Sequence, residues 1–273
     1  MPLRREKSLK SCNLWGDCTV YTKERLMRDL AALGIRPDDT VFVHSSVKAV
    51  GPVDGGADTI LDALLDYLRD GLLVFPTHTW NRITDVRVFD ARNDPSCVGL
   101  LSNLALKRPG CVRSLNPSHS VAAFGRDARA YVEGDARAVT PLPRFGTMGQ
   151  LIDRDGVILL LGCSPKRNTF LHCVEEALDI PDRIDPNPYP VEVVDMDGNR
   201  TTRLHAGHFC NAGGVSDGYD RAVPLLLHSG AMWTGMFGDA LVFAERAARV
   251  NDVMGEKLRE NPDFFTPEPM ERK

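Results

Sequence analysis

The sequence predicts an α/β fold in a single domain, residues 1–273. Runs rich in β-branched, aromatic and aliphatic residues at 40–46, 71–80 and 156–164 are typical of buried strands. Amphipathic stretches at 22–33 and 59–68 alternate with the first two of these runs. Such alternation favours a sheet that is covered by helices. No internal repeat or low-complexity linker divides the chain, so one domain is the simplest interpretation.

The first elements carry start and stop signals. Thr22 is an expected N-cap for the helix at 22–33, because its hydroxyl oxygen can accept from a free backbone N–H of the first turn. Gly34 follows as a C-terminal stop. The strand at 71–80 is expected to stop at Pro76. The first 80 residues therefore alternate between helix and strand.

The remainder of the chain is interpreted in the same way. A buried strand is expected within 156–164, a helix at 167–178, and a hairpin at 189–206 around the Asp-Gly pair. The other expected segments are a turn-rich stretch at 89–99, a helix at 100–108, a strand after Pro117 within 113–125, an irregular stretch at 140–151, a short strand plus helix at 239–260, and peripheral tails at 1–20 and 261–273.

Composition excludes several classes of protein. A hydrophobic share of 43%, a charged share of 26% and a net charge of −4 are ordinary for a globular chain and provide no basic footprint for nucleic acid. The seven cysteines are dispersed without a C-x-x-C pair, which favours reduced thiols in the cytoplasm. There is no signal-peptide pattern and no apolar run of membrane-spanning length, so no membrane partner is expected.

The stretch RNTFLHCVEEAL, at 167–178, combines a helix with chemistry-bearing residues. Its apolar residues recur at helical spacing, and Asn168 or Thr169 can cap its start. His172 then falls on or beside the opposite face, together with Glu175 and Glu176. A neutral imidazole can accept a proton, and a nearby carboxylate can orient it. From this stretch alone, a solvent-facing or structural His172 is the simpler interpretation.

A metal site has weaker support. His172 and Glu176 are four residues apart on the expected helix, which suits metal ligation sterically. The H-E-x-x-H pattern is absent, however, and the other pair at ligand spacing is His205 with His208, which is expected in a surface loop. No metal is therefore predicted.

Nucleophile and phosphate sites also have weak support. Cys163, Ser45 and Ser46 follow expected strands, but none lies in a G-x-S-x-G elbow. A buried cysteine after an apolar strand is usually a packing residue, and the two serines better suit hydrogen bonding to a ligand. The glycine-rich loop at 50–58 could hold an anion at a helix N-terminus, although a tight turn explains it more simply.

Several segments together resemble the aminoglycoside 3-N-acetyltransferase family, which is distinct from the GNAT superfamily. They cover most of residues 20–250, and their order and spacing are specific although each is weak alone. The segments are VFVHSSVKAVGPVDGGADTILDAL, LLVFPTHTW, FDARNDPSCVGLLSNLALKRPGCVRSLNPSHSVAAFG, TPLPRFGTMGQL and LLLGCSPKRNTFLHCVEE. The resemblance implies a three-layer α/β/α fold with a central mixed sheet, often dimeric.

The resemblance also implies acetyl-CoA as co-substrate and acetylation of the 3-amino group of 2-deoxystreptamine aminoglycosides, which confers antibiotic resistance. His172 is then the general base, with Glu175 and Thr169 beside it, and no covalent intermediate or metal is needed. Residues implied to line the CoA arm are Ser45, Ser46, Val47, Thr77, His119, Ser120 and Val121. Candidates for the wall around a cationic acceptor are Trp80, Asp90 and Glu175.

The chain departs from the family pattern in loops that are expected to face the acceptor. Asn116 stands where many members have a histidine. Pro165 and Lys166 replace a histidine and an asparagine, and the T-P-C-G-x-x-S pattern is altered at Leu142, Pro143 and Gly146. Two alternatives therefore stay open: the same chemistry on another small amine, such as an aminophosphonate or a biosynthetic intermediate, and a CoA-binding homologue without turnover.

Overall fold

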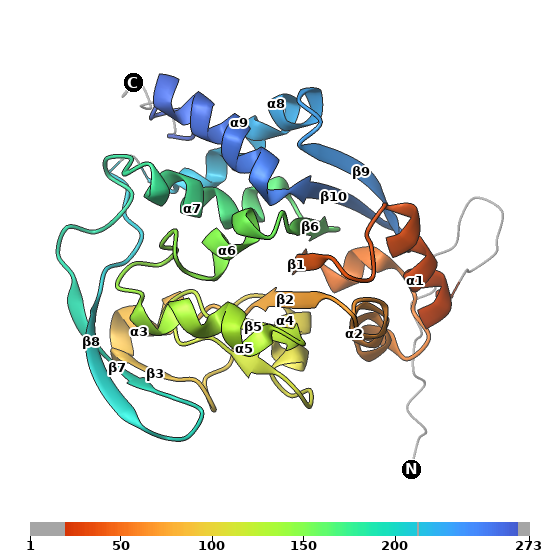
Figure 1. The fold of residues 1–273 in the computed structure, drawn as a ribbon, viewed down its shortest axis with the longest axis horizontal. Coiled ribbons are helices and arrows are strands. Elements are labelled where there is room, and N and C mark those ends of the chain that lie inside the picture. Colours follow the sequence, from red (N-terminus) through yellow and green to blue (C-terminus); the bar gives the residue numbers. More distant parts are fainter. Residues whose placement is uncertain (1–19, 212, 267–273) are drawn as a thin grey trace, which may run out of the picture.

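The main sheet of the computed structural model, which describes residues 20–211 and 213–266, has seven strands (Figure 1). Their order is β4-β5-β2-β1-β6-β10-β9. The central strand β1 is parallel to β2 and β6, and the outer pairs are antiparallel, so the predicted mixed sheet is confirmed. The strands are β1 (Thr40–Ser45), β2 (Leu72–Pro76), β4 (Val112–Arg113), β5 (Val121–Gly125), β6 (Val157–Leu161), β9 (Met232–Phe237) and β10 (Ala240–Arg246).

Alternation along the central strands creates two apolar layers. In β1, Val41 and Val43 face one layer while Phe42 faces the other, because successive side chains point to opposite faces of a sheet. Helices cover both faces, which confirms the predicted three-layer arrangement (Figure 1). One layer holds α1 (Lys23–Ala32), α2 (Gly56–Tyr67) and α4 (Leu100–Ala105); the other holds α5 (Ala128–Val132), α6 (Thr147–Asp153), α7 (Phe170–Ala177), α8 (Val223–His228) and α9 (Ala247–Glu260).

A second, three-stranded sheet lies beside the main one, in the order β3-β7-β8. Strands β7 (Tyr189–Val194) and β8 (Arg200–His205) form the predicted hairpin, which extends along one side of the molecule in Figure 1. Strand β3 (Val88–Asp90) pairs in parallel with β7, and helix α3 (Trp80–Val86) covers a small apolar cluster there. This sheet brings residues around 205–208 close to the main sheet.

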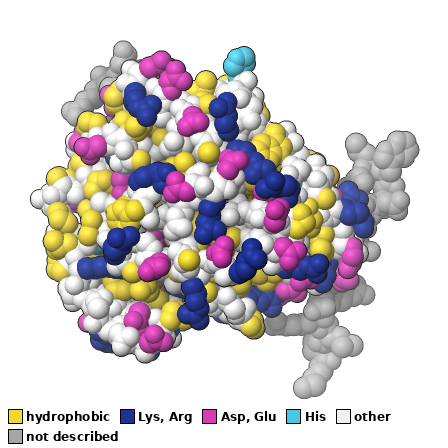
Figure 2. All heavy atoms as spheres, in the orientation of Figure 1, with side chains coloured by type: hydrophobic (Ala, Val, Ile, Leu, Met, Phe, Trp, Pro, Cys, Tyr) yellow, Lys and Arg dark blue, Asp and Glu magenta, His cyan; other side chains and the backbone are white. Residues whose placement is uncertain are grey.

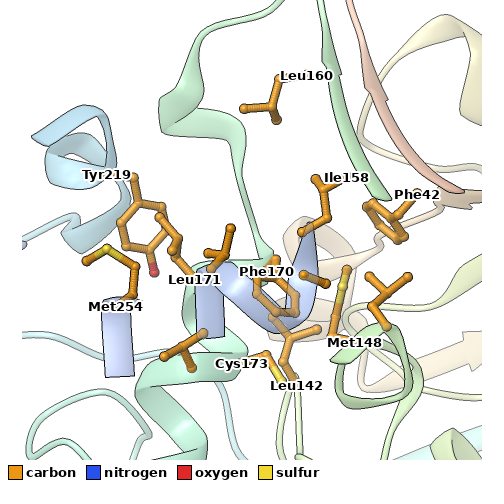
Figure 3. Packing of buried hydrophobic residues seen from close by; sticks show 14 of the residues in the cluster. Phe42, Leu142, Met148, Ile158, Leu160, Phe170, Leu171, Cys173, Tyr219 and Met254 are labelled. Atoms are coloured by element: carbon orange, nitrogen blue, oxygen red, sulfur yellow. The ribbon is translucent and has the colours of Figure 1, made fainter. Parts of the chain in front are cut away.

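Helix α7 is anchored by its apolar face. Phe170, Leu171 and Cys173 are buried, and Figure 3 shows them among side chains from the sheet and from α6 and α9. The side chain of Asn168 accepts a hydrogen bond from the N–H of Phe170, so Asn168 rather than Thr169 supplies the side-chain cap. Packing of this kind is the main source of stability for an eight-residue helix, which is marginal alone.

Exposed charges contribute less to this fold than its apolar layers. Figure 2 shows positive and negative side chains intermixed over the face drawn. Ion pairs such as Arg144–Asp153, at 2.6 Å, are solvent-exposed, and pairs of this kind typically contribute about 0–1 kcal/mol each. In the described part of the chain, no helix has the length and apolar character needed to cross a bilayer.

The structure differs from the sequence prediction in several segments. The stretch at 140–151 was expected to be irregular, but helix α6 begins at Thr147 because its apolar residues Met148 and Leu151 pack into the core. Strand β9 and helices α3, α5 and α8 had not been expected. Within the expected peripheral tail at 261–273, the side chain of Phe265 is fully buried and packs into one of the two apolar layers. Residues 1–19 and 267–273 lie outside the described residues.

Candidate active site

The carboxyl ends of three parallel strands meet at one cavity of about 880 Å³. β1 ends at His44 and Ser45, β2 is followed by His78, and β6 is followed by Cys163. Ligands of α/β proteins bind beyond this edge of the sheet, and the volume suits a small-molecule site. The polar lining groups include His44, Ser45, Ser46, Lys48, His78, Ser118, His119, Lys166, Arg167, Thr169, His172, His208, Ser216 and Tyr219.

The turn after β6 explains how two walls of the cavity approach each other. Gly162 has a φ of +64°, and a Cβ at this position would lie 2.4 Å from the Cβ of Ala49. Ala49 belongs to the 3-10 helix η1 (Val47–Val50), which directly follows Ser46. A glycine is therefore required here, both for the backbone conformation and for the close approach of the two segments.

His172 lies on the wall formed by helix α7, with its side chain 15% exposed. Its Nδ1 atom is 2.6 Å from the hydroxyl of Tyr219 and 3.4 Å from Oε2 of Glu175. The ring of His208 stacks on the imidazole with a centroid distance of 4.0 Å. Two contacts from distant parts of the chain therefore fix the ring.

Glu175 is completely buried behind His172. Arg183 donates from Nε to Oε1, and the Tyr219 hydroxyl donates to Oε2, each at 2.6 Å. Burial opposes ionisation, but the interactions with His172, Tyr219 and Arg183 outweigh it and lower the pKa of Glu175. The carboxylate next to His172 is therefore charged at neutral pH.

Glu176 points elsewhere, although it is adjacent to Glu175 in sequence. Its carboxylate accepts hydrogen bonds from the hydroxyl of Thr140 and from the N–H of Leu142. Burial raises the pKa of Glu176. The helix therefore directs one glutamate to His172 and uses the other to hold the 140–142 loop.

Further histidines surround His172. His119 contacts both His78 and His208, with ring centroids 4.5 Å and 4.9 Å apart. The hydroxyl of Ser118 joins Nδ1 of His119 to Nε2 of His205, at 2.8 Å and 2.9 Å. Burial lowers the pKa of His78 to about 3 and that of His205 to about 4, so both stay neutral near pH 7.

The structure corrects the expectation that residues 205–208 form a surface loop. His205 is fully buried at the end of β8, and His208 stacks on His172. The sequence contained the H-x-x-H spacing, but only the position of the β7–β8 hairpin reveals its surroundings. The described residues contain no group of three or more possible ligands that could hold a metal ion.

Thr169 lies at the cavity wall one turn before His172. Its hydroxyl is 3.4 Å from Nε2 of His44, which is a long contact. Burial lowers the pKa of His44 to about 3, so this imidazole is neutral. Thr169 thus keeps a hydroxyl that a ligand can reach.

The predicted CoA-contacting residues divide into two groups. Ser45, Ser46, Val47 and His119 line the cavity, whereas Thr77, Ser120 and Val121 do not. The hydroxyl of Ser120 donates to the backbone carbonyl of Thr77, and both residues are fully buried. Val121 begins the buried strand β5. These three residues support the cavity wall from behind instead of forming it.

The predicted acceptor wall is only partly assembled. Trp80 lines the cavity and is half-exposed. Asp90 does not line it, and its carboxylate is bound by Arg92 and Asn93. Although burial opposes ionisation, hydrogen bonds from these two neighbours lower the pKa of Asp90 to about 2. Asp90 is therefore a structural anion at the end of β3, where it holds the turn that follows.

The structure supports neither Cys163 as a nucleophile nor the 50–58 loop as a phosphate site. Cys163 lines the cavity, but burial raises the pKa of its thiol to about 11, so it is protonated at neutral pH. The glycine-rich loop at 50–58 does not line the cavity. Gly55 and Gly56 have φ values of +75° and +65°, which fits the simpler interpretation of that loop as a tight turn.

Three residues of the site had no functional role in the sequence prediction. They are Arg183, His208 and Tyr219, and each contacts Glu175 or His172. Tyr219 lies 44 residues from Glu175 and Arg183 only eight, but no motif of the 167–178 helix singles out either of them or His208. Parallel strands that end at a cavity, and a histidine at that cavity backed by a buried carboxylate, define an α/β protein equipped for proton transfer.

Comparison with known proteins agrees with this class. The model of the family described as aminoglycoside 3-N-acetyltransferase matches residues 42–259, and the chain belongs to that family. Aminoglycoside N(3)-acetyltransferase VII of Streptomyces paromomycinus is 32% identical over 59% of this chain and 62% of its own length. Aminoglycoside N(3)-acetyltransferase III of a Salmonella species is 31% identical over 60% and 63%. The chain thus matches less than two thirds of these relatives.

Solved structures support the fold over a longer span. A structure described as AAC-IIIb binary with CoASH has a TM-score of 0.77 and 26% identity, covering 92% of this chain and 100% of that one. A structure described as AAC-VIa bound to sisomicin has a TM-score of 0.75 and 25% identity, covering 89% and 98%. The three-layer arrangement is therefore that of the family.

Proposed function

We propose that this protein transfers the acetyl group of acetyl-CoA to an amine of a small molecule, with His172 as general base. The observation that carries the proposal is the position of His172 at the cavity, backed by Tyr219 and the charged Glu175. Membership of an N-acetyltransferase family supports the reaction class.

The reaction needs no covalent enzyme intermediate. His172 takes a proton from the acceptor ammonium, and the freed amine attacks the thioester carbonyl carbon. The new C–N bond forms and the C–S bond breaks, the attacking nitrogen releases its second proton to give the neutral amide, and the CoA thiolate takes up one proton. General-base catalysis of this kind contributes about 10²–10⁴-fold to the rate. The Thr169 hydroxyl, also at the cavity wall, is our candidate donor to the developing oxyanion.

The lining residues suit a CoA thioester. Ser45 and Ser46 offer hydroxyls and backbone groups, and Val47 offers an apolar contact for the pantetheine arm. Lys48, exposed beside them, can meet a phosphate. A similar solved structure is described as containing CoASH, which supports the same ligand here.

Two acceptor classes are supported by different observations. The family and its named relatives favour the 3-amino group of a 2-deoxystreptamine aminoglycoside, and sisomicin is the ligand of one similar structure. The charged residues lining the cavity favour an amine that also carries an anionic group, because Lys48, Lys166 and Arg167 are present and no carboxylate lines it among the described residues. Polycations bind best beside carboxylates.

An acceptor panel tests the proposal. Thiol release from acetyl-CoA is measured with kanamycin, gentamicin, apramycin and small aminophosphonates, and each product mass is checked for one added acetyl group. Turnover confined to the first three supports the aminoglycoside, and turnover confined to the aminophosphonates supports the anionic amine. Tight CoA binding without turnover on any acceptor would instead favour a homologue that has lost catalysis.

We further propose a cytoplasmic homodimer. The dispersed, reduced cysteines support the compartment, and the family resemblance supports the dimer. Light scattering of the purified chain at several concentrations measures its mass, and a mass of one chain throughout would contradict the dimer.

A further inference from the structure

The hydroxyl of Tyr219 lies between the two residues of the proposed acid–base pair. It is 2.6 Å from Nδ1 of His172 and 2.6 Å from Oε2 of Glu175. The direct distance between those two atoms is 3.4 Å, which exceeds the 2.7–3.2 Å typical of an N–H···O hydrogen bond. The tyrosine oxygen is therefore the closer partner of both.

The protons available on these groups determine the donor in each of the two hydrogen bonds of the Tyr219 hydroxyl. Glu175 is a carboxylate with a lowered pKa, and it has no proton to donate. Burial, reinforced by the charge of Glu175, raises the pKa of Tyr219 well above its usual range, so the phenol keeps its single proton. That proton goes to Glu175, and the tyrosine oxygen must then accept from Nδ1–H of His172.

We propose that Tyr219 is a positioning residue that holds His172 in the Nδ1–H tautomer. This tautomer leaves the lone pair on Nε2, the nitrogen that must take the proton from the acceptor amine. No hydrogen bond within the described residues uses Nε2 of His172. The inference rests on the proposed role of His172 as base. It adds Tyr219 as the group that keeps the proton on Nδ1 and so leaves Nε2 free to act as the base.

The surroundings of Tyr219 keep its hydroxyl in place. The residue lies in the 3-10 helix η4 (Val215–Ala222), and its ring packs edge-on against Phe265 with a centroid distance of 4.8 Å. Figure 3 shows the ring beside Leu171 and Met254, with its hydroxyl oxygen at the far end. Tyr219 is 1% exposed, so little water can reach its hydroxyl and compete for the hydrogen bonds with His172 and Glu175.

Glu175 is held as firmly on the other side. Arg183 binds Oε1 and is itself anchored by the backbone carbonyls of Pro181 and Pro262. The carboxylate therefore cannot easily move toward His172 to replace the hydroxyl. Loss of that hydroxyl should weaken the preference of His172 for one tautomer.

Tyr219→Phe removes only the hydroxyl and keeps the ring contacts. The matched control is Tyr131→Phe, because Tyr131 is also fully buried and donates to one backbone carbonyl, that of Thr147, at 2.7 Å on the α5–α6 side. Long-range ¹H–¹⁵N correlation spectra of ¹⁵N-histidine-labelled protein report the tautomer of His172, with its signals assigned through a His172→Asn variant. Steady-state kinetics with acetyl-CoA and the acceptor found in the panel give kcat, KM and the pH profile.

We expect a single Nδ1–H tautomer in the wild type and in Tyr131→Phe, and a mixture of tautomers in Tyr219→Phe. In Tyr219→Phe, kcat should fall about 10- to 100-fold, the range for one hydrogen bond in a charged network, with KM for acetyl-CoA changed less than about threefold. A pure Nδ1–H tautomer together with wild-type kcat in Tyr219→Phe would overturn the inference and show that Glu175 orients the ring alone. The spectra report the tautomer without any turnover. A protein that acetylates no acceptor can therefore still show whether Tyr219 sets the tautomer of His172, so failure of the proposed function is distinguished from failure of this inference.

Discussion

Replacement of Glu175 by glutamine tests the buried charge behind His172. Glutamine keeps the shape of the side chain but removes its charge. Its amide group can still accept from Arg183 through oxygen, and it then presents NH₂ to Tyr219. The Tyr219 proton would turn toward Nδ1 of His172, which forces the wrong tautomer on the base.

The magnitude follows from the burial of both partners. Glu175 is 0% exposed and Arg183 is 4% exposed, at a distance of 2.6 Å. Removal of one partner from a buried ion pair costs about 3–5 kcal/mol, and we expect the lower end because the amide oxygen still accepts one bond. Against a total stability of about 5–15 kcal/mol, this loss is large. We also expect kcat to fall at least about 100-fold.

Urea unfolding followed by circular dichroism measures the stability, and thiol release measures kcat. Glu176→Gln is the matched control: it alters the next residue of the same helix, which bonds to Thr140 and Leu142, so kcat should stay within about threefold of the wild type. A double-mutant cycle with Arg183→Met should show a coupling of about 1–3 kcal/mol. If Glu175→Gln loses less than about 1 kcal/mol and the coupling is absent, the reasoning from buried charge is refuted.

Three further predictions concern separate parts of the molecule. His172→Ala should lower kcat at least about 100-fold while calorimetric affinity for acetyl-CoA stays within about threefold, and near-normal turnover would exclude the base role. Burial raises the pKa of Glu245 to about 8 from 4.5, so the folded state keeps a proton that the unfolded chain releases. This contribution to stability is complete below pH 4.5 and is lost as the pH rises to 8. Over this pH range, the free energy of unfolding of Glu245→Gln should therefore rise relative to that of the wild type, by about 1.4 kcal/mol for each unit of difference between the folded and unfolded pKa. A difference in unfolding free energy that stays constant with pH would contradict the prediction. Asn116→Ala should lower the free energy of unfolding in urea by about 2 kcal/mol or more. The reason is that the Asn116 side chain donates to the carbonyls of Thr140 and Pro141 and accepts from the N–H groups of Ser118 and His119. A loss below about 0.5 kcal/mol would contradict this role.

The Asn116 contacts also show what one departure from the family pattern does in this structure. Asn116 is 1% exposed and clamps the turn before β5 to the 140–141 loop, so its side chain supports the wall next to His119. By contrast, Lys166 and Arg167 lie at the cavity itself. The first departure therefore concerns support of the wall, and the second concerns what the cavity can bind.

Short-range patterns were sufficient to predict the central strands of the sheet and the helices α1, α2, α4, α7 and α9. The strands β1, β2 and β6 and the β7–β8 hairpin were predicted because apolar runs and the Asp-Gly turn are local signals. Helix α6 was not predicted, since seven residues with two glycines on its edges or inside it have a weak pattern, and burial of Met148 and Leu151 decides its state. Strand β9 depends on pairing with β10, which is a tertiary contact.

The sequence by itself determined the family resemblance, the α/β class and the helix that carries His172, because these depend on periodicity and on motifs within a few residues. The choice between Glu175 and Glu176 was made by the resemblance, and the structure supplies the physical reason: one carboxylate faces His172 and the other holds the 140–142 loop. Only the tertiary structure brought Tyr219 and His208 to the imidazole. Tyr219 lies 47 residues from His172 along the chain, and such contacts are set by how packed layers and the hairpin meet, which no local spacing encodes.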